Sequence, residues 1–176
     1  MSSAGWFTVL VLAVGVERLV ELRVARRNLA WAEARRGVEY GRDHYPVMVV
    51  LHVFLLVGSV AEVWLLSAPF LPWLGWPMLG LVVLAQLLRW WCIRTLGHQW
   101  NTRVVVVPDL PLVTGGPYRY LRHPNYVAVV IEGIALPMVG FAWVTALVFT
   151  VLNVPLLAVR LRVENAALAT LPAPSP

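Results

Sequence analysis

The sequence predicts an all-α, polytopic integral membrane protein with about five transmembrane helices, the last two of which form a C-terminal hairpin. Of its 176 residues, 60% are hydrophobic and only 13% are charged, which is far from the composition of a water-soluble domain. The mean hydropathy is +0.74, and the nine tryptophans fit the enrichment of indole rings at membrane interfaces. The apolar residues come in long runs, as in proteins that cross the bilayer repeatedly.

Residues 1–94 are predicted to contain three of the spans. Each apolar run is long enough to cross the hydrocarbon core and ends beside charged or aromatic residues that suit the interface. The second run has a proline at its first turn, where proline is tolerated. The three spans extend from Gly5 to Val20, from Pro46 to Leu66, and from about Trp73 or Pro77 to Ile93.

The connections between these spans differ in charge. The segment Asn28–Tyr45 carries charges of both signs, which predicts a connecting segment that is partly helical and lies on the membrane surface. The turn Ser67–Trp76 is rich in proline and tryptophan and has no charge. We therefore expect the two connections to lie on opposite sides of the membrane.

Residues 95–176 are predicted to contain a catalytic loop, a helical hairpin and a tail, within a single domain that covers 1–176. The polar stretch Thr95–Pro124 is too long for a simple turn, and its β-branched run Val104–Val107 favours an ordered loop. The 35 apolar residues that follow are too many for one perpendicular span. We expect two helices, Asn125–Met138 and Phe141–Val159, of which the first is short enough to be tilted or re-entrant.

The basic residues predict the orientation. All fourteen are arginine, and twelve of them follow the first, third and fifth apolar runs. The positive-inside rule then places the N-terminus outside, the C-terminus in the cytoplasm and any site in the arginine-rich loops on the cytoplasmic face of the cell membrane. Little soluble surface remains for a basic patch, which argues against a nucleic-acid partner. The oligomeric state cannot be predicted.

The densest group of reactive side chains lies between Gly115 and Tyr126. Two arginines, a histidine and three tyrosines converge on the start of the fourth predicted helix. Free backbone N–H groups at a helix N-terminus, together with guanidinium groups, can bind a carboxylate or a phosphate. A basic segment beside a span can equally contact lipid headgroups. The residue pattern alone leaves both interpretations open.

This segment, from Leu112 through the run GGPYRYLRHPNY to Tyr126, resembles the GPYRYxRHPxY signature of the isoprenylcysteine carboxyl methyltransferase family, which is related to phospholipid methyltransferases. Arg160 and the run Glu164 to Leu168 resemble the arginine and EExxL motif of that family. Leu96, Gly97 and Trp100 add upstream support. The resemblance covers about the last 85 residues and implies S-adenosylmethionine as the methyl donor.

The resemblance also implies roles for individual residues. Glu164 matches the first glutamate of the family and suits the ammonium group of the cofactor. Arginines would hold the cofactor carboxylate or the anionic oxygen of the substrate. The implied cofactor-binding residues are Gly116, Pro117, Tyr118, His123, Pro124, Tyr126 and Glu164, and the candidate catalytic residues are Arg119, Arg122, Arg160 and Glu132.

Two positions depart from the family pattern. Asn165 stands where a second glutamate is common, and Ala128 where a glycine often follows the tyrosine. The first departure questions a second carboxylate contact with the cofactor, and the second questions the closest approach of the helix. Together they suggest a subfamily with a different substrate.

Several polar residues in the apolar runs have two interpretations. Glu132 faces either the active site or a partner on another helix, and His52 and Glu62 are expected to be packing groups. His98 and Gln99 could line the mouth of a substrate site. The histidines at 98 and 123 lack the spacing and the third partner of a metal site, so we expect no metal.

The sequence therefore predicts a membrane O-methyltransferase that acts on an acidic oxygen of a lipophilic substrate. Similarity to bacterial family members with the same His-Pro-Asn-Tyr variant favours an alkylpyrone or phenolic polyketide lipid over an isoprenylcysteine. The alternatives are a phospholipid-type N-methyltransferase and a non-enzymatic lipid-binding or carrier module. The expected partners are the lipophilic substrate and membrane lipids.

Overall fold

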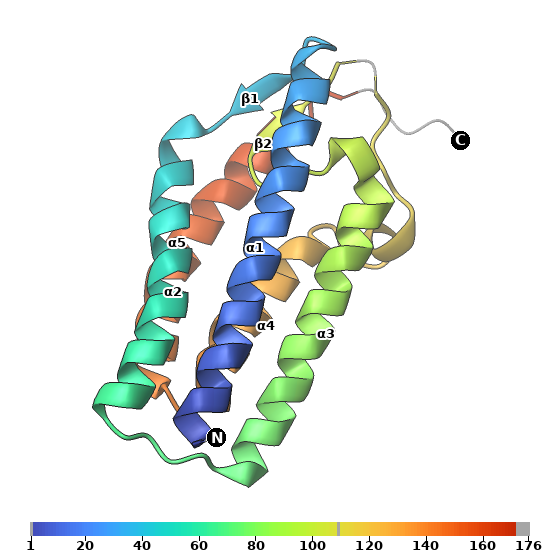
Figure 1. Cartoon of the computed structure of the whole chain (residues 1–176). Helices are drawn as coiled ribbons and strands as arrows, with labels where there is room; N and C mark the ends of the chain where they lie inside the picture. Colours follow the sequence, from blue (N-terminus) through green and yellow to red (C-terminus); the bar gives the residue numbers. More distant parts are fainter. Residues whose placement is uncertain (1, 109, 172–176) are drawn as a thin grey trace.

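The computed structural model describes residues 2–108 and 110–171, and its main elements are five α-helices that run side by side (Figure 1). The N-terminus and the turn between the second and third helices lie at one end of the bundle, and the polar segments gather at the other. The helices are α1 (Ser3–Glu33), α2 (Tyr45–Leu65), α3 (Pro72–Leu96), α4 (Pro124–Val139) and α5 (Trp143–Leu168).

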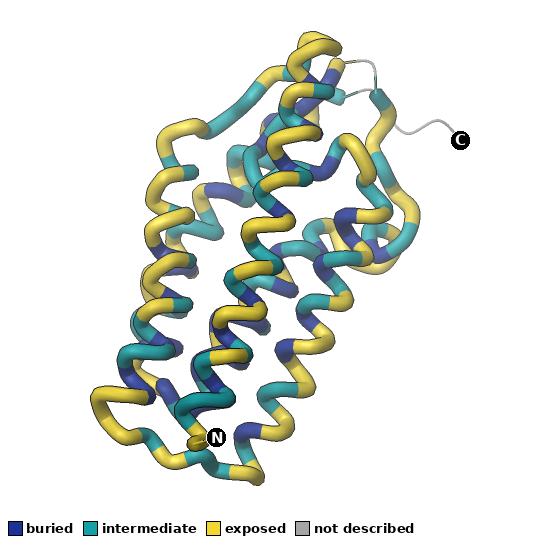
Figure 2. Tube along the Cα trace, viewed as in Figure 1, coloured by how far each residue is buried: buried dark blue, intermediate teal, exposed yellow. Residues whose placement is uncertain are grey.

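Three of the described helical segments are long and apolar enough to cross a membrane. Their most apolar windows have mean hydropathies of 2.1, 1.4 and 2.0 for Arg42–Leu65, Pro72–Gln99 and Trp143–Leu168. α4 is apolar but shorter, and α1 becomes charged from Glu17 onward. Exposed residues recur along the outer surfaces of the helices (Figure 2), and many are large hydrophobic side chains. The chain is thus a helical membrane protein, and its count of five spans stays a prediction.

One prediction about the polar end needs correction. α1 continues past Val20 to Glu33, because no glycine or proline interrupts the chain between Val20 and Gly37 and most residues there form helices well. Helices dominate the described residues, as the all-α class predicts, and the polar end adds one small sheet. In it, β1 (Val38–Tyr40) pairs antiparallel with β2 (Val104–Val106), and two valines of β2 bury their side chains against the end of α5.

The hairpin of α4 and α5 is fastened by an acidic residue of α2. Glu62 accepts hydrogen bonds from the backbone N–H groups of Val144 and Thr145, at 2.9 and 2.7 Å, and from the Thr145 hydroxyl at 2.7 Å. The first backbone N–H groups of a helix lack intrahelical partners, so Glu62 serves as the cap of α5. The predicted packing role of Glu62 is therefore helix capping, in which a carboxylate of α2 binds the first turn of α5.

Replacing Glu62 with alanine should lower stability by about 1–2 kcal/mol, because it removes the cap from buried N–H groups. Replacing it with glutamine should cost less, since the amide oxygen still accepts. The measurement is the thermal unfolding midpoint of the detergent-solubilised protein, followed by tryptophan fluorescence. Equal midpoints for the wild type and Glu62→Ala would contradict the capping role.

A cluster of charged side chains joins α1, α3 and α4 inside the bundle. Glu132 accepts hydrogen bonds from Arg18 at 2.6 Å and from Arg89 at 2.9 Å. Glu21 lies 2.5 Å from Arg18 and 3.5 Å from Arg89, while Gln86 accepts a hydrogen bond from Arg18. The two carboxylates and two guanidinium groups balance in charge, as buried charges require.

Candidate functional site

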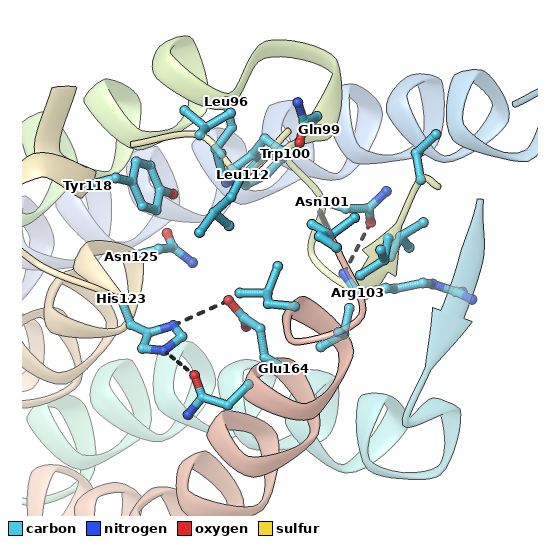
Figure 3. Close-up of a pocket in the computed structure, with 18 of the residues that line it drawn as sticks. Leu96, Gln99, Trp100, Asn101, Arg103, Leu112, Tyr118, His123, Asn125 and Glu164 are labelled. Carbon is cyan, nitrogen blue, oxygen red and sulfur yellow. Dashed lines mark hydrogen bonds and ion pairs between the residues drawn. The ribbon is translucent and has the colours of Figure 1, made fainter. Parts of the chain in front are cut away.

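A cavity of about 470 Å³ opens at the polar end of the bundle. Its walls come from the ends of α1, α3 and α5, from the loop that carries β2, and from the segment that leads into α4 (Figure 3). The volume falls within the range of small-molecule sites, about 300–1,000 Å³. The lining has a polar part and an apolar part, and the apolar part includes Leu96, Val104, Val106, Leu112 and Leu168.

The segment before α4 is held in place by a tight approach to α3. A 3₁₀ turn over Gly116–Arg119 precedes the helix, and Gly116 adopts a φ of +56° beside the Thr95 side chain. A Cβ atom at this position would collide with Thr95, so glycine is required there. α4 then begins at Pro124, where the missing N–H has no cost. His123 and Tyr126 flank this start.

The acidic end of the cavity is built around Glu164 of α5. One carboxylate oxygen lies 3.3 Å from His123 Nδ1, and the other accepts a hydrogen bond from the Tyr126 hydroxyl. His123 Nε2 lies 2.9 Å from Asn165 Oδ1. The hydrogen bond to Glu164 raises the pKa of His123 above its usual value of 6.5. This end of the cavity can therefore bind a cation.

Arg160 lies next to the acidic end, and each of its three guanidinium nitrogens contacts another protein group. Its guanidinium donates to the Tyr126 hydroxyl at 2.8 Å and to the backbone carbonyl of Thr102 at 2.6 Å, and it also contacts the sulfur of Met48. Its side chain is buried. These contacts join α5, α4, α2 and the loop before β2, so Arg160 orients Tyr126 toward Glu164.

Two buried polar atoms on the cavity wall lack a protein partner. Among the described residues, Trp100 Nε1 and Asn125 Oδ1 are both buried without a hydrogen bond. Unpaired buried polar atoms are costly, so such atoms on a cavity wall indicate a place for a ligand. Asn125 and Glu164 face the same space from opposite sides (Figure 3). The cavity thus offers a free donor, a free acceptor and a carboxylate.

The structure brings together six of the residues that the sequence nominated. Gly116, Pro117 and Pro124 shape the adjacent backbone without lining the cavity, and Arg119 is exposed to solvent. Glu132 is absent from the lining and belongs to the buried charged cluster of α1, α3 and α4. The nominated residues that line the cavity are Tyr118, Arg122, His123, Tyr126, Arg160 and Glu164.

The sequence interpretation did not assign a role to Asn28 or Asn125, which both line the cavity. Asn28 donates hydrogen bonds to the carbonyls of Gly97 and Trp100, at 3.0 and 2.7 Å, and so holds the loop after α3 against α1. A signal existed in each case. Asn28 follows Glu21 by seven residues on one helix face, and Asn125 directly precedes the tyrosine of the motif.

The loop after α3 lines the cavity as well. His98, Gln99, Asn101 and Arg103 contribute to its wall, as the sequence interpretation expected for the first two residues. Arg103 is paired with Glu39 of β1 at 3.0 Å, which ties this wall to the small sheet. The polar rim therefore depends on the pairing of β1 and β2.

Comparison with known proteins finds one matching family profile and similar proteins in two bacteria. Residues 78–170 match the profile of the isoprenylcysteine carboxyl methyltransferase (ICMT) family. The chain is 36% identical to "Uncharacterized protein YpbQ" of Bacillus subtilis, over 92% of this chain and 96% of the relative. It is 26% identical to an "Uncharacterized protein" of Haemophilus influenzae, over 88% and 90% of the two chains. No solved structure matches.

Proposed function

Because the chain belongs to the isoprenylcysteine carboxyl methyltransferase family, a family of membrane methyltransferases, we propose that it transfers a methyl group from S-adenosylmethionine to an acidic oxygen of a lipophilic acceptor. The observation that carries the proposal is the cavity itself. There the motif segment meets the end of α5, so that Glu164, His123 and Tyr126 border one space with two unpartnered polar atoms.

The chemistry of the cavity wall fits the cofactor. The Glu164 carboxylate suits the ammonium group of the cofactor. The free acceptor Asn125 Oδ1 and the free donor Trp100 Nε1 match the amino group and ring nitrogens of a nucleoside base. Gly116, Pro117 and Pro124 fix the backbone that carries these groups, and Tyr118 adds an aromatic wall.

The cofactor, when bound, supplies an electrophilic methyl group on a sulfonium centre. The protein must then align the acceptor oxygen and keep water away. The apolar wall of Val104, Val106 and Leu112 serves the second task. An acceptor that is already ionised needs no strong base. Arg122 is the better placed arginine for the acceptor oxygen, since Arg160 is already engaged by three partners.

The position of the cavity supports a lipid acceptor. It lies at one end of a bundle that exposes many large hydrophobic side chains, within reach of a lipid molecule with a long tail. Within this class we propose an alkylpyrone or phenolic polyketide lipid ahead of an isoprenylcysteine. The arginine-rich connections lie at the same end, which supports a cytoplasmic orientation.

The purified protein in nanodiscs should transfer a labelled methyl group from S-adenosylmethionine into a bacterial total lipid extract. Mass spectrometry of the labelled product should identify an O-methylated acidic lipid. Labelled phosphatidylethanolamine derivatives would instead establish a phospholipid-type N-methyltransferase. If the folded protein neither transfers the label nor binds S-adenosylhomocysteine in a calorimetric titration, the non-enzymatic module is correct.

A further inference from the structure

The histidine at the cavity wall faces two oxygen acceptors at once. His123 Nδ1 lies 3.3 Å from the Glu164 carboxylate, and Nε2 lies 2.9 Å from Asn165 Oδ1. A neutral imidazole has one N–H donor and one acceptor nitrogen, whereas the imidazolium ion donates from both. With the amide oxygen of Asn165 toward Nε2, only the imidazolium satisfies both contacts. In this arrangement His123 is an internal cation beside Glu164.

The other groups around His123 oppose this cation in part without cancelling it. Its ring stacks on Tyr126 of α4 with centroids 5.5 Å apart. Arg122, in the same segment, is exposed and opposes the charge only in part, and Arg160 lies behind Tyr126 with its own partners. The hydrogen bond that His123 donates to Glu164 outweighs these effects and raises the pKa of His123.

The same carboxylate is the group proposed for the cofactor ammonium. Its second oxygen accepts a hydrogen bond from the Tyr126 hydroxyl, so an incoming ammonium that binds the other oxygen shares it with His123. Two positive charges that share one carboxylate repel each other, and a like charge within about 4–6 Å disfavours the protonated form of a base. Loss of the proton from His123 relieves this repulsion.

We propose that Asn165 is a positioning residue that holds the His123 imidazolium against Glu164, so that cofactor binding displaces this internal cation and releases its proton. The inference rests on the proposed function. The direction of the pH dependence follows from the thermodynamic linkage between cofactor binding and proton release. His123 is protonated in the free protein and neutral in the complex, so affinity rises with pH. Asn165 is exposed on α5, and its replacement should leave the fold intact.

The test is calorimetric titration of the full-length protein with S-adenosylhomocysteine between about pH 5.5 and 7.5, below the usual pKa of a free α-amino group near 7.7. The Kd of the wild type should fall by up to about tenfold per pH unit. Titrations in two buffers of different ionisation enthalpy should report the release of about one proton. In Asn165→Leu the Kd should decrease by less than about threefold per pH unit. Nε2 loses its acceptor in this variant, so less of the His123 in the free protein is protonated.

Two further variants sharpen the test. Asn165→Asp keeps an acceptor beside Nε2 and should keep the pH dependence, whereas Ala166→Ser, also exposed on α5, is the matched control and should behave as the wild type. A Kd that is constant with pH, or an unchanged slope in Asn165→Leu, would overturn the inference and leave the proposed function standing. Absence of binding at every pH would overturn both.

Discussion

Replacing Glu164 with alanine is expected to weaken binding of S-adenosylhomocysteine by about ten- to a hundredfold and to abolish methyl transfer. The carboxylate is the anionic group of the cavity that faces His123 and Tyr126, and loss of a buried hydrogen bond to a charged group costs about 1.5–3 kcal/mol. The measurement is a calorimetric titration at pH 7.5, where competition from His123 is weakest.

The control for this prediction is Glu164→Gln, which keeps the shape of the side chain and its hydrogen bond with Tyr126. It should bind better than the alanine variant but still worse than the wild type, because the amide carries no charge. Both proteins should unfold within a few degrees of the wild type. A folded Glu164→Ala protein with wild-type affinity would refute the assignment of this carboxylate to the cofactor.

Replacing Glu132 with alanine is expected to destabilise the protein by about 3–5 kcal/mol, the usual cost of removing one partner from a buried ion pair. Glu132 is buried between Arg18 and Arg89, so its loss leaves two guanidinium groups with too little negative charge. The midpoint of thermal unfolding should fall by several degrees or more, and the yield of folded protein should drop.

A conservative variant separates structure from catalysis at this position. Glu132→Gln keeps one acceptor oxygen for the arginines, so enough protein should fold for titration. Because Glu132 does not line the cavity, the folded fraction should bind S-adenosylhomocysteine as the wild type does. A stable Glu132→Gln protein with much weaker binding would place this residue in the site after all.

The sequence predicted the positions of the apolar helices well, because hydrophobic run length is set by the bilayer. The ends of the helices were harder to predict. α5 continues nine residues past the predicted boundary at Val159 to Leu168, since Arg160, Arg162 and Glu164 made the segment look like a polar tail. The strand pairing of Val38–Tyr40 with Val104–Val106 was missed, because it joins segments that are far apart in the sequence.

The residues of the site could be predicted only where they belong to a motif of neighbouring residues in the sequence. The motif from Gly115 to Tyr126 contained most of the nominated residues, and the match to Glu164 came from a second motif. Asn28 could not be found in this way, because its role depends on the carbonyls of the loop after α3. Glu132 was noticed but given the wrong setting. A charged residue in an apolar run fits both a buried ion pair and an active site, so its position in the sequence does not distinguish the two.

The length of α5 has a consequence for how the cavity forms. The wall that carries Glu164 and Asn165 belongs to α5, and the valines of β2 pack against Ala167 of the same helix. The cavity wall is therefore incomplete until the end of α5 has packed against the loop that carries β2. A ligand that fills the cavity should in turn stabilise this packing, because it binds only the assembled form.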